Sequence, residues 1–245
     1  MLETQTQDKR LLLISNSTLH GSGYLDHAEA ELRDVLGTTG RVLFVPFALH
    51  DWDGYAGQAR KRLKAMGYEL DSLHEAADAR NAVEQAEAIF VGGGNTFRLL
   101  SALYRLDLVS RIRQRVGKGM IYVGTSAGAV VAAPSIKTTN DMPIVQPPSF
   151  KALGLVAFQI NAHYLDPDSN STHMGETREE RIRQFLEENE TPVVAIREGC
   201  MIRVDKGTHI LRGRTNARVF RRGCEPIELE PGSTLDQLLA ETREA

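Results

Sequence analysis

Short apolar runs alternate with amphipathic stretches along the first half of the chain. Unbroken apolar triplets occur within residues 41–48, 88–94 and 119–126, in RVLFVPFA, AIFVGGG and GMIYVGTS. Strands that are buried on both faces show such runs, whereas residues 25–36 space their apolar positions three and four apart, as helices do. This alternation of strand and helix predicts a mostly parallel sheet with helices on both faces.

The remaining segments continue the pattern. Residues 136–149 hold three prolines and little periodicity, so we expect an ordered functional loop there. The further predicted strands span residues 10–18, 68–73, 158–164 and 192–198. Helices are predicted over residues 55–66, 79–86 and 176–189, and one or two helices over residues 97–116. A hairpin is predicted over residues 200–213, with its turn at Lys206 and Gly207.

These elements predict an α/β fold, a three-layer sandwich around a mostly parallel, doubly wound sheet. At 245 residues the chain fits one domain over residues 1–245, and two small domains are the alternative. Residues 1–9 are predicted to form a flexible extension, and residues 231–245 a C-terminal tail or helix.

Composition narrows the class of protein. Hydrophobic residues make up 42% and charged residues 25% of the chain, as in ordinary globular proteins. The net charge of -3 argues against a protein that works on nucleic acid, because phosphate backbones attract basic surfaces. Cys200 and Cys224 form no CxxC pair, which favours a reducing compartment. With neither a signal peptide nor an apolar run of about 20 residues, we expect a cytoplasmic protein without a membrane partner.

A nucleophile elbow is the sharpest chemical signal. Residues 124–128 read GTSAG, directly after the apolar residues 121–123 and before the small-residue run AVVAA. On a tight strand-to-helix turn the serine hydroxyl rises above the edge of the sheet, and the helix N-terminus behind it offers free N–H groups. The placement favours Ser126 as a nucleophile, and an ordinary Gly/Ser turn is the alternative.

A second loop has the composition of an oxyanion hole. Residues 92–96, GGGNT, follow a predicted strand and precede a helix, and glycine N–H groups can face a developing negative charge. A phosphate-binding turn or a plain connection is the alternative, but the loop matches neither GxGxxG nor GxxxxGK[ST]. Because ligands bind at the carboxyl ends of the strands in such sheets, we expect this loop and Ser126 to meet.

A serine nucleophile needs a base, and the base needs an acid to orient it. His163, at the end of a predicted strand, is the first candidate base, and His173 in the next loop is the second. Each candidate acid would otherwise be a solvated loop carboxylate, and the candidates are Asp141, Asp166, Asp168 and Glu198.

Metal sites are a weaker interpretation. His163 with Asp166, or His173 with Glu176, would be possible ligand pairs, but neither is part of an HExxH motif. No Cys–His cluster has the spacing of a zinc site either. We therefore expect neither a metal nor another cofactor.

Four long segments resemble one family of peptidases. They are GGGNTFRLL at residues 92–100, YVGTSAGAVVAAPSIKTTNDMPIVQPPSF at 122–150, LGLVAFQINAHYLD at 153–166 and HMGETREERIRQFL at 173–186. In these segments the chain is similar to the peptidase E family of α-aspartyl dipeptidases. The resemblance implies a flavodoxin-like fold, like that of class I glutamine amidotransferases, with a nucleophile elbow.

The resemblance also implies roles for single residues. By motif, Ser126 is the nucleophile, His163 the base and Glu198 the acid, with Asp141 as a second candidate for the acid. The implied oxyanion donors are the backbone N–H groups of Gly94 and Ala127.

One position departs from the family's pattern. Thr125 precedes the serine where family members often have an aromatic residue such as tryptophan. The elbow stays intact, but a wall of the pocket is expected to change shape.

The implied substrate is a dipeptide with an N-terminal aspartate. Its β-carboxylate needs a cation or several N–H donors, because an unpaired buried carboxylate is unfavourable. Arg178 is the candidate, in the first turn of a helix opened by the capping box Thr177–Glu180, and a solvated helix charge is the alternative. The residues expected to meet the ammonium or the scissile amide of the substrate are Asn95, Thr96 and Asp141.

We therefore expect a cytoplasmic serine exopeptidase that acts through an acyl-enzyme, as a monomer or homodimer with a small peptide as its partner. Two alternatives remain: a cyanophycinase-like or other β-aspartyl hydrolase on the same fold, and a non-catalytic binding protein. A glutamine amidotransferase is disfavoured because its elbow nucleophile is cysteine, whereas this chain has Ser126.

Overall fold

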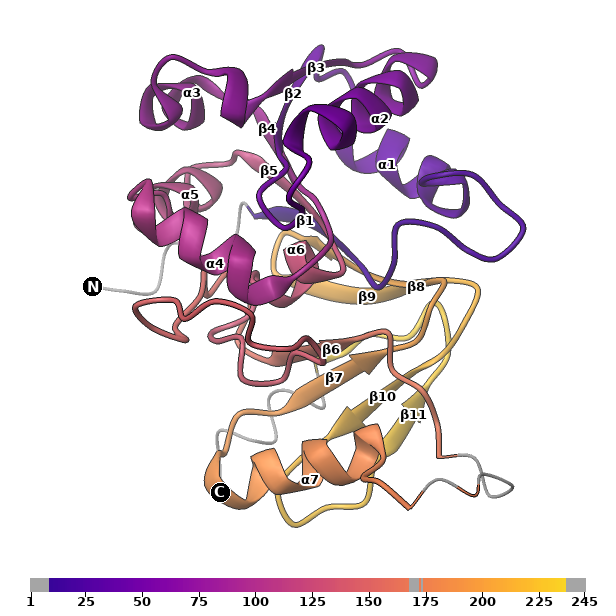
Figure 1. The fold of residues 1–245 in the computed structure, drawn as a ribbon. Coiled ribbons are helices and arrows are strands. Elements are labelled where there is room, and N and C mark those ends of the chain that lie inside the picture. Colours follow the sequence, from indigo (N-terminus) through magenta and orange to yellow (C-terminus); the bar gives the residue numbers. More distant parts are fainter. Residues whose placement is uncertain (1–8, 168–171, 173, 237–245) are drawn as a thin grey trace.

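The computed structural model describes residues 9–167, 172 and 174–236. Its larger part is a seven-stranded sheet in the order β3-β2-β4-β5-β1-β8-β9 (Figure 1). The first five strands in that order are parallel, and β8 runs antiparallel to β1. The strands are β1 Arg10–Ile14, β2 Arg41–Val45, β3 Glu69–Ser72, β4 Ala88–Val91, β5 Ile121–Thr125, β8 Cys200–Asp205 and β9 Thr208–Gly213.

Helices cover both faces of this sheet. Successive residues of a strand point to opposite faces and are buried under different helices. Leu12, Val42 and Phe90 belong to a core shared with α1 and α2. Leu11 and Val91 belong to a second core, shared with the helices of the opposite face. The helices are α1 Glu29–Leu36 and α2 Trp52–Ala65 on one face, and α3 Ala79–Gln85, α4 Thr96–Arg105, α5 Val109–Gly117 and α6 Ala127–Val130 on the other. The predicted three-layer α/β sandwich is thereby confirmed.

A separate four-stranded sheet, in the order β11-β10-β7-β6, follows in the second half of the chain (Figure 1). β6 (Gln159–Ala162) and β7 (Val193–Ile196) pair in parallel, and β10 (Ala217–Phe220) lies antiparallel between β7 and β11 (Ile227–Leu229). The helix α7 (Arg178–Glu188) covers one face of this sheet. The sequence pattern predicted the strands β6 and β7 but not this second sheet.

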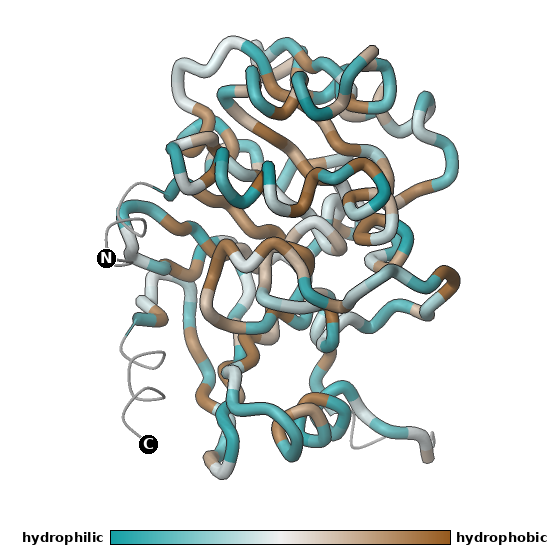
Figure 2. The backbone as a smooth tube through the Cα atoms, turned by 90° about the vertical axis from the view of Figure 1, so that its left-hand side faces the viewer, coloured by the Kyte–Doolittle hydropathy of each residue, from teal (hydrophilic) through white to brown (hydrophobic). Residues whose placement is uncertain are grey.

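Local predictions fare well where the pattern is strong. The hairpin over residues 200–213 is formed by β8 and β9, and its turn residues Lys206 and Gly207 both have positive φ, as a tight hairpin requires. Residues 136–149 contain neither helix nor strand. Figure 2 shows the helices alternating between hydrophobic and hydrophilic residues, as expected for helices packed on one side.

Some predictions concern parts of the chain that the structure does not describe. Residues 1–8 and 237–245 lie outside the described residues, as do the candidate residues Asp168 and His173. Among the described residues, no helix is both long enough and apolar enough to cross a bilayer.

Candidate active site

The turn between β5 and α6 places Ser126 in a strained backbone conformation. Its φ of 51° and ψ of -111° are unusual for a residue with a side chain. Two flanking glycines make this turn possible. A Cβ on Gly124 would lie 2.4 Å from the carbonyl oxygen of Gly128, and a Cβ on Gly128 would lie 2.1 Å from that of Val91. The GxSxG spacing is therefore a steric requirement of this elbow.

A chain of hydrogen bonds starts at this serine. Ser126 Oγ lies 2.9 Å from His163 Nε2, and His163 Nδ1 lies 2.8 Å from Glu198 Oε1. His163 follows β6 and Glu198 follows β7, so the arrangement joins the end of a large-sheet strand to the ends of two small-sheet strands. The side chains of His163 and Glu198 are 38% and 50% exposed, which leaves the group open to a substrate.

Asp141, the second candidate acid, faces a different partner. Its Oδ2 accepts hydrogen bonds from the backbone N–H of Thr96 at 2.7 Å, from Thr96 Oγ1 at 2.5 Å and from Thr139 Oγ1 at 3.2 Å. The carboxylate thus sits at the N-terminus of α4, where the helix dipole favours a negative charge. Its Oδ1 has no hydrogen-bond partner among the described residues.

Asn95 and Thr96, which were expected to meet the substrate, are engaged within the protein. Asn95 caps α4, with Oδ1 accepting from the N–H of Arg98 at 3.0 Å, and its Nδ2 donates to the carbonyl of Met142 at 2.9 Å. Thr96 is buried and bonded to Asp141. Both residues tie the loop at Asp141 and Met142 to the start of α4.

The glycine loop lies directly beside the elbow, since a Cβ on Gly93 would come within 3.0 Å of the Ser126 Cβ. Most of its N–H groups are already used. The Gly92 N–H donates to the Val45 carbonyl at 3.1 Å, and the Gly93 N–H donates to the Tyr55 hydroxyl at 2.8 Å. The Asn95 N–H donates to the Ala48 carbonyl at 2.9 Å. Within the described part of the chain, the N–H groups of Gly94 and Ala127 donate to no acceptor.

Tyr55 helps to hold the glycine loop, a role that the sequence pattern did not indicate. It lies in α2, where one more apolar position in an amphipathic helix carries no chemical signal. In the structure it is buried, and its hydroxyl occupies the Gly93 N–H. Burial raises the pKa of Tyr55, so the hydroxyl stays neutral and available as an acceptor.

Thr125 does not line a pocket. Its side chain is fully buried, and its Oγ1 would lie 3.6 Å from a Cβ on Gly93. The residue therefore lies under the glycine loop, and its effect on the shape of a pocket wall stays a prediction.

Arg178 begins α7 beside the base. The predicted capping box is present: Thr177 Oγ1 accepts from the N–H of Glu180 at 3.1 Å, and the Glu180 side chain accepts from the N–H of Thr177 at 2.6 Å. The guanidinium of Arg178 makes one long hydrogen bond, 3.5 Å to the carbonyl of Ala162, the residue before His163.

The electrostatic surroundings of Arg178 are unusual for a helix-start arginine. No carboxylate of the described residues lies within ion-pair distance of it. Burial, and then the charge of Arg181, lower the pKa of Arg178, while the charges of Glu198 and Asp141 raise it. A half-buried cation that pairs with no anion of the described residues therefore lies near the triad-like group.

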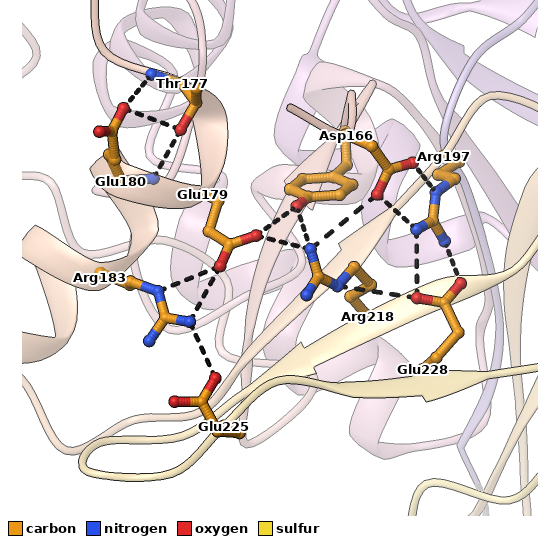
Figure 3. A network of polar contacts seen from close by, with 10 residues as sticks. Asp166, Thr177, Glu179, Glu180, Arg183, Arg197, Arg218, Glu225 and Glu228 are labelled. Carbon is orange, nitrogen blue, oxygen red and sulfur yellow. Dashed lines mark hydrogen bonds and ion pairs between the residues drawn. The ribbon is translucent and has the colours of Figure 1, made fainter. Parts of the chain in front are cut away.

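The segments that carry His163 and Glu198 are joined by charged side chains. Arg197 precedes Glu198, and its guanidinium donates to both oxygens of Asp166, at 2.7 Å each. Asp166, one of the candidate acids, is thus occupied by Arg197 (Figure 3). Arg197 also bonds Glu228 on β11 at 2.6 Å. Sequence reasoning missed Arg197, because an arginine beside a candidate acid has many possible partners.

The structure brings no metal-ligand set to the elbow within its described residues. The one grouping there whose ligand atoms lie within 4.8 Å of one another is Asp53, His74 and Glu75, near α2 and β3. In it, Glu75 already pairs with Arg60 at 2.7 Å. Of the two pairs considered from the sequence, His163 with Asp166 is not assembled, since His163 faces Ser126 and Asp166 faces Arg197. The other pair includes His173, which lies outside the described residues.

Comparison with known proteins places this geometry in a family. The model of the family described as "Peptidase family S51" matches residues 11–212. "Peptidase E" of Streptomyces coelicolor is 54% identical over 229 residues, 94% of each chain. "Probable alpha-aspartyl dipeptidase" of Drosophila melanogaster is 48% identical over 234 residues, 94% of this chain and 98% of that protein.

A solved structure agrees at the level of the fold. The structure of a peptidase from an acI-B1 Actinobacterium superposes with a TM-score of 0.68 at 18% identity, over 94% of this chain and 97% of that one. With the extent of the family match and the identity of these relatives, it follows that the chain belongs to peptidase family S51.

Proposed function

We propose that this protein is a serine exopeptidase that hydrolyses dipeptides with an N-terminal aspartate. One observation carries the proposal above all others. A Ser126–His163–Glu198 chain of hydrogen bonds lies beside two backbone N–H groups that donate to no acceptor among the described residues, in a member of a peptidase family. The proteins named Peptidase E and Probable alpha-aspartyl dipeptidase support the choice of substrate.

In the proposed mechanism His163 takes the proton of Ser126 as the hydroxyl attacks the aspartyl carbonyl carbon. The N–H groups of Gly94 and Ala127 donate to the oxyanion that forms. His163 then returns the proton to the departing amine, the C–N bond breaks, and an acyl-enzyme remains on Ser126. Water, deprotonated by His163, then attacks the ester carbonyl. Aspartate is released, and Ser126 recovers its hydroxyl proton from His163. Glu198 holds the imidazole in orientation and stabilises its charged form.

Specificity for aspartate follows in this proposal from two charged groups. Arg178 is a half-buried cation without an ion-pair partner among the described residues, and it binds the β-carboxylate of the substrate. The Oδ1 of Asp141, which has no partner among the described residues, receives the substrate's ammonium group. Asn95 and Thr96 act indirectly, because they hold Asp141 and the loop that carries it.

We further propose that the enzyme acts in the cytoplasm. Both cysteines are free, Cys200 in the core and Cys224 at the surface. Free thiols of this kind are usual in a reducing compartment.

Hydrolysis of Asp-Leu tests the proposal, with Leu-Leu and β-linked Asp-Leu as competing substrates and a chelator in every assay. We expect cleavage of Asp-Leu alone, and loss of that cleavage in a folded Ser126→Ala variant. Cleavage of the β-linked peptide alone would instead favour the β-aspartyl hydrolase. No cleavage of any of the three would favour a binding protein. Full activity of Ser126→Ala would disprove the serine mechanism.

A matched pair of variants tests the specificity residues. Arg178→Met is expected to raise KM for Asp-Leu about 100-fold or more, because a charge-assisted pair with the substrate is lost. Arg181→Met, on the same helix and more exposed, serves as the control and should leave KM within about twofold. Equal effects of the two would show that Arg178 acts only through helix charge.

A further inference from the structure

The C-terminal end of β1 touches all three segments of the proposed triad. The Ile14 carbonyl accepts the N–H of Ser126 at 2.9 Å. Ser15 Oγ accepts the N–H of His163 at 2.9 Å, and Asn16 Oδ1 accepts the N–H of Gly199, the neighbour of Glu198, at 2.8 Å. Three successive residues of one strand end therefore anchor the nucleophile, the base and the acid segment.

The three anchored residues share one backbone property. Ser126, His163 and Gly199 all have positive φ, at 51°, 54° and 85°. For a residue with a side chain this conformation costs on the order of 1–3 kcal/mol, and it persists only where the surroundings hold it. In each case the N–H of the residue with positive φ is the group that the end of β1 binds. Strain and anchor coincide at Ser126 and His163, whereas the anchored residue of the acid segment is a glycine, which adopts this conformation without strain.

The hydroxyl of Ser15 makes two hydrogen bonds at once, one to each of two strand ends of the small sheet. It is fully buried, and its hydroxyl also donates to the carbonyl of Ile196, the last residue of β7, at 2.9 Å. It thereby fixes the ends of β6 and β7, from which His163 and Glu198 project, to a strand of the other sheet. A hydroxyl suits this position, because it donates and accepts at once.

Asn16 makes a similar double contact. Its side chain is buried, its Oδ1 receives the Gly199 N–H, and its Nδ2 donates to the carbonyl of Thr18 at 2.9 Å. The backbone at Glu198 is held from a second side by Thr215, whose Oγ1 donates to the Glu198 carbonyl at 2.7 Å. The acid segment is thus fixed on both sides of its side chain.

We propose that Ser15 and Asn16 are positioning residues that set the distances within the Ser126–His163–Glu198 group. This inference rests on the proposed function of that group. Neither residue touches the reacting atoms. Their contribution is to hold His163 and Glu198 within hydrogen-bond reach of Ser126, and small displacements of such groups lower the rate steeply.

Ser15→Ala tests the proposal, with Thr138→Val as the matched control. Thr138 is also buried, and its hydroxyl donates to a β6 carbonyl, that of Ile160, at 2.9 Å, without contact to the triad. We expect Ser15→Ala to lower kcat for Asp-Leu about 10- to 100-fold with KM within about twofold, since the change affects orientation rather than binding. Ser15→Thr, which keeps the hydroxyl, should restore most of the loss. Thr138→Val should leave both constants within about twofold.

A second assay separates this proposal from the proposed substrate. A fluorophosphonate phosphonylates Ser126, as the serine oxygen bonds to phosphorus and fluoride leaves, and the rate depends on the His163 base and on no aspartyl peptide. Ser15→Ala and Asn16→Ala should slow this reaction about tenfold or more relative to Thr138→Val. That outcome would support the positioning role even if Asp-Leu is not a substrate.

Several results would overturn the proposal. One is a Ser15→Ala enzyme with the kcat and fluorophosphonate rate of Thr138→Val. A folded Ser15→Thr enzyme as slow as Ser15→Ala would do the same. If Ser15→Ala does not fold, Asn16→Ala decides by the same rates, and unchanged rates there would count against the proposal.

Discussion

The two sheets hold their halves of the proposed active site by different means. The large sheet places Ser126 and the glycine loop on parallel strands buried on both faces, where Leu12, Phe90 and Val123 are at most 1% exposed. The small sheet places His163 and Glu198 at the ends of β6 and β7, with a smaller apolar core under α7.

Ion pairs and hydrogen bonds of charged side chains connect the elements of the small-sheet half. Arg218 on β10 bonds Glu179 on α7 at 2.6 Å and the Tyr164 hydroxyl at 3.0 Å (Figure 3). Arg197 lies 5.6 Å above the Tyr164 ring and bonds Asp166 and Glu228. The ion pairs link α7, β7, β10 and the segment after His163.

The difference predicts how each half responds to change. Apolar packing changes little with salt or with moderate changes of pH. Partly exposed ion pairs weaken at high salt, which screens them, and at acidic pH, which protonates their carboxylates. The large-sheet half, which carries Ser126, should be disrupted only when core packing is lost and the whole protein unfolds. The small-sheet half, which carries His163 and Glu198, should be disrupted when its ion pairs are lost.

The largest effect is expected from a cavity in the large sheet. Phe90 is 1% exposed and packs on the Phe44 ring with centroids 5.1 Å apart. Phe90→Ala should lower the free energy of unfolding by about 3–5 kcal/mol, as measured by urea denaturation. Leu49→Ala, at a side chain that is 39% exposed, is the control and should change it far less. Similar values for the two would contradict the account of the large sheet.

Removing the central charge of the small sheet is expected to have an intermediate effect. Arg197→Gln leaves Asp166 and Glu228 only their longer ion pairs with Arg218, at 4.0 and 3.7 Å. Both carboxylates are about half exposed and remain hydrated, so stability should fall by about 1–2 kcal/mol. The difference from the unsubstituted protein should shrink in 1 M salt, because screening weakens the pairs. A loss that does not change with salt would indicate packing instead of charge.

Acid should weaken the small sheet first. Hydrogen bonds from Arg197 lower the pKa of Asp166, and for Glu179 those from Arg183 and Arg218 lower the pKa against the opposing effect of burial. A carboxylate with a lowered folded-state pKa stabilises the protein above its unfolded value of about 4, and this stabilisation is lost as pH falls through the folded value. Stability measured from pH 6 to pH 2.5 should therefore fall less steeply in Asp166→Asn. An unchanged slope would contradict the role given to this carboxylate.

The smallest effect is expected at an ion pair on the edge of the large sheet. Arg41 and Asp71 pair at 2.8 Å, with side chains that are 65% and 54% exposed. Arg41→Ala should change the free energy of unfolding much less than Arg197→Gln does, because exposed ion pairs contribute little to stability. A larger loss than in Arg197→Gln would reverse the comparison between the two sheets.

The sequence predicts the large sheet well because its strands are buried on both faces. Runs such as LFV, IFV and IYV leave little choice of structure, and the steric demands of the elbow are visible as GTSAG. The small sheet could not be predicted in the same way, because residues 159–162 and 193–196 are short and their pairing depends on contacts distant in sequence.

The site divides along the same line. Ser126 and His163 can be selected from their places at strand ends, but no local pattern tells Glu198, at the end of a predicted strand, from Asp141, in a loop, since an acid could come from either place. Ser15 and Asn16 carry no signal at all, because small polar residues are common after a strand. Their partners lie 148 and 183 positions away along the chain.

The acid is therefore the point at which one measurement tests the account most directly. The kcat for Asp-Leu should be measured in Glu198→Gln and Asp141→Asn, together with the stability of both. We expect Glu198→Gln to lose about 100-fold or more in kcat while remaining folded, since the half-exposed carboxylate orients His163 and contributes little to stability. A Glu198→Gln enzyme with unchanged kcat, beside an inactive but folded Asp141→Asn enzyme, would contradict the proposed triad.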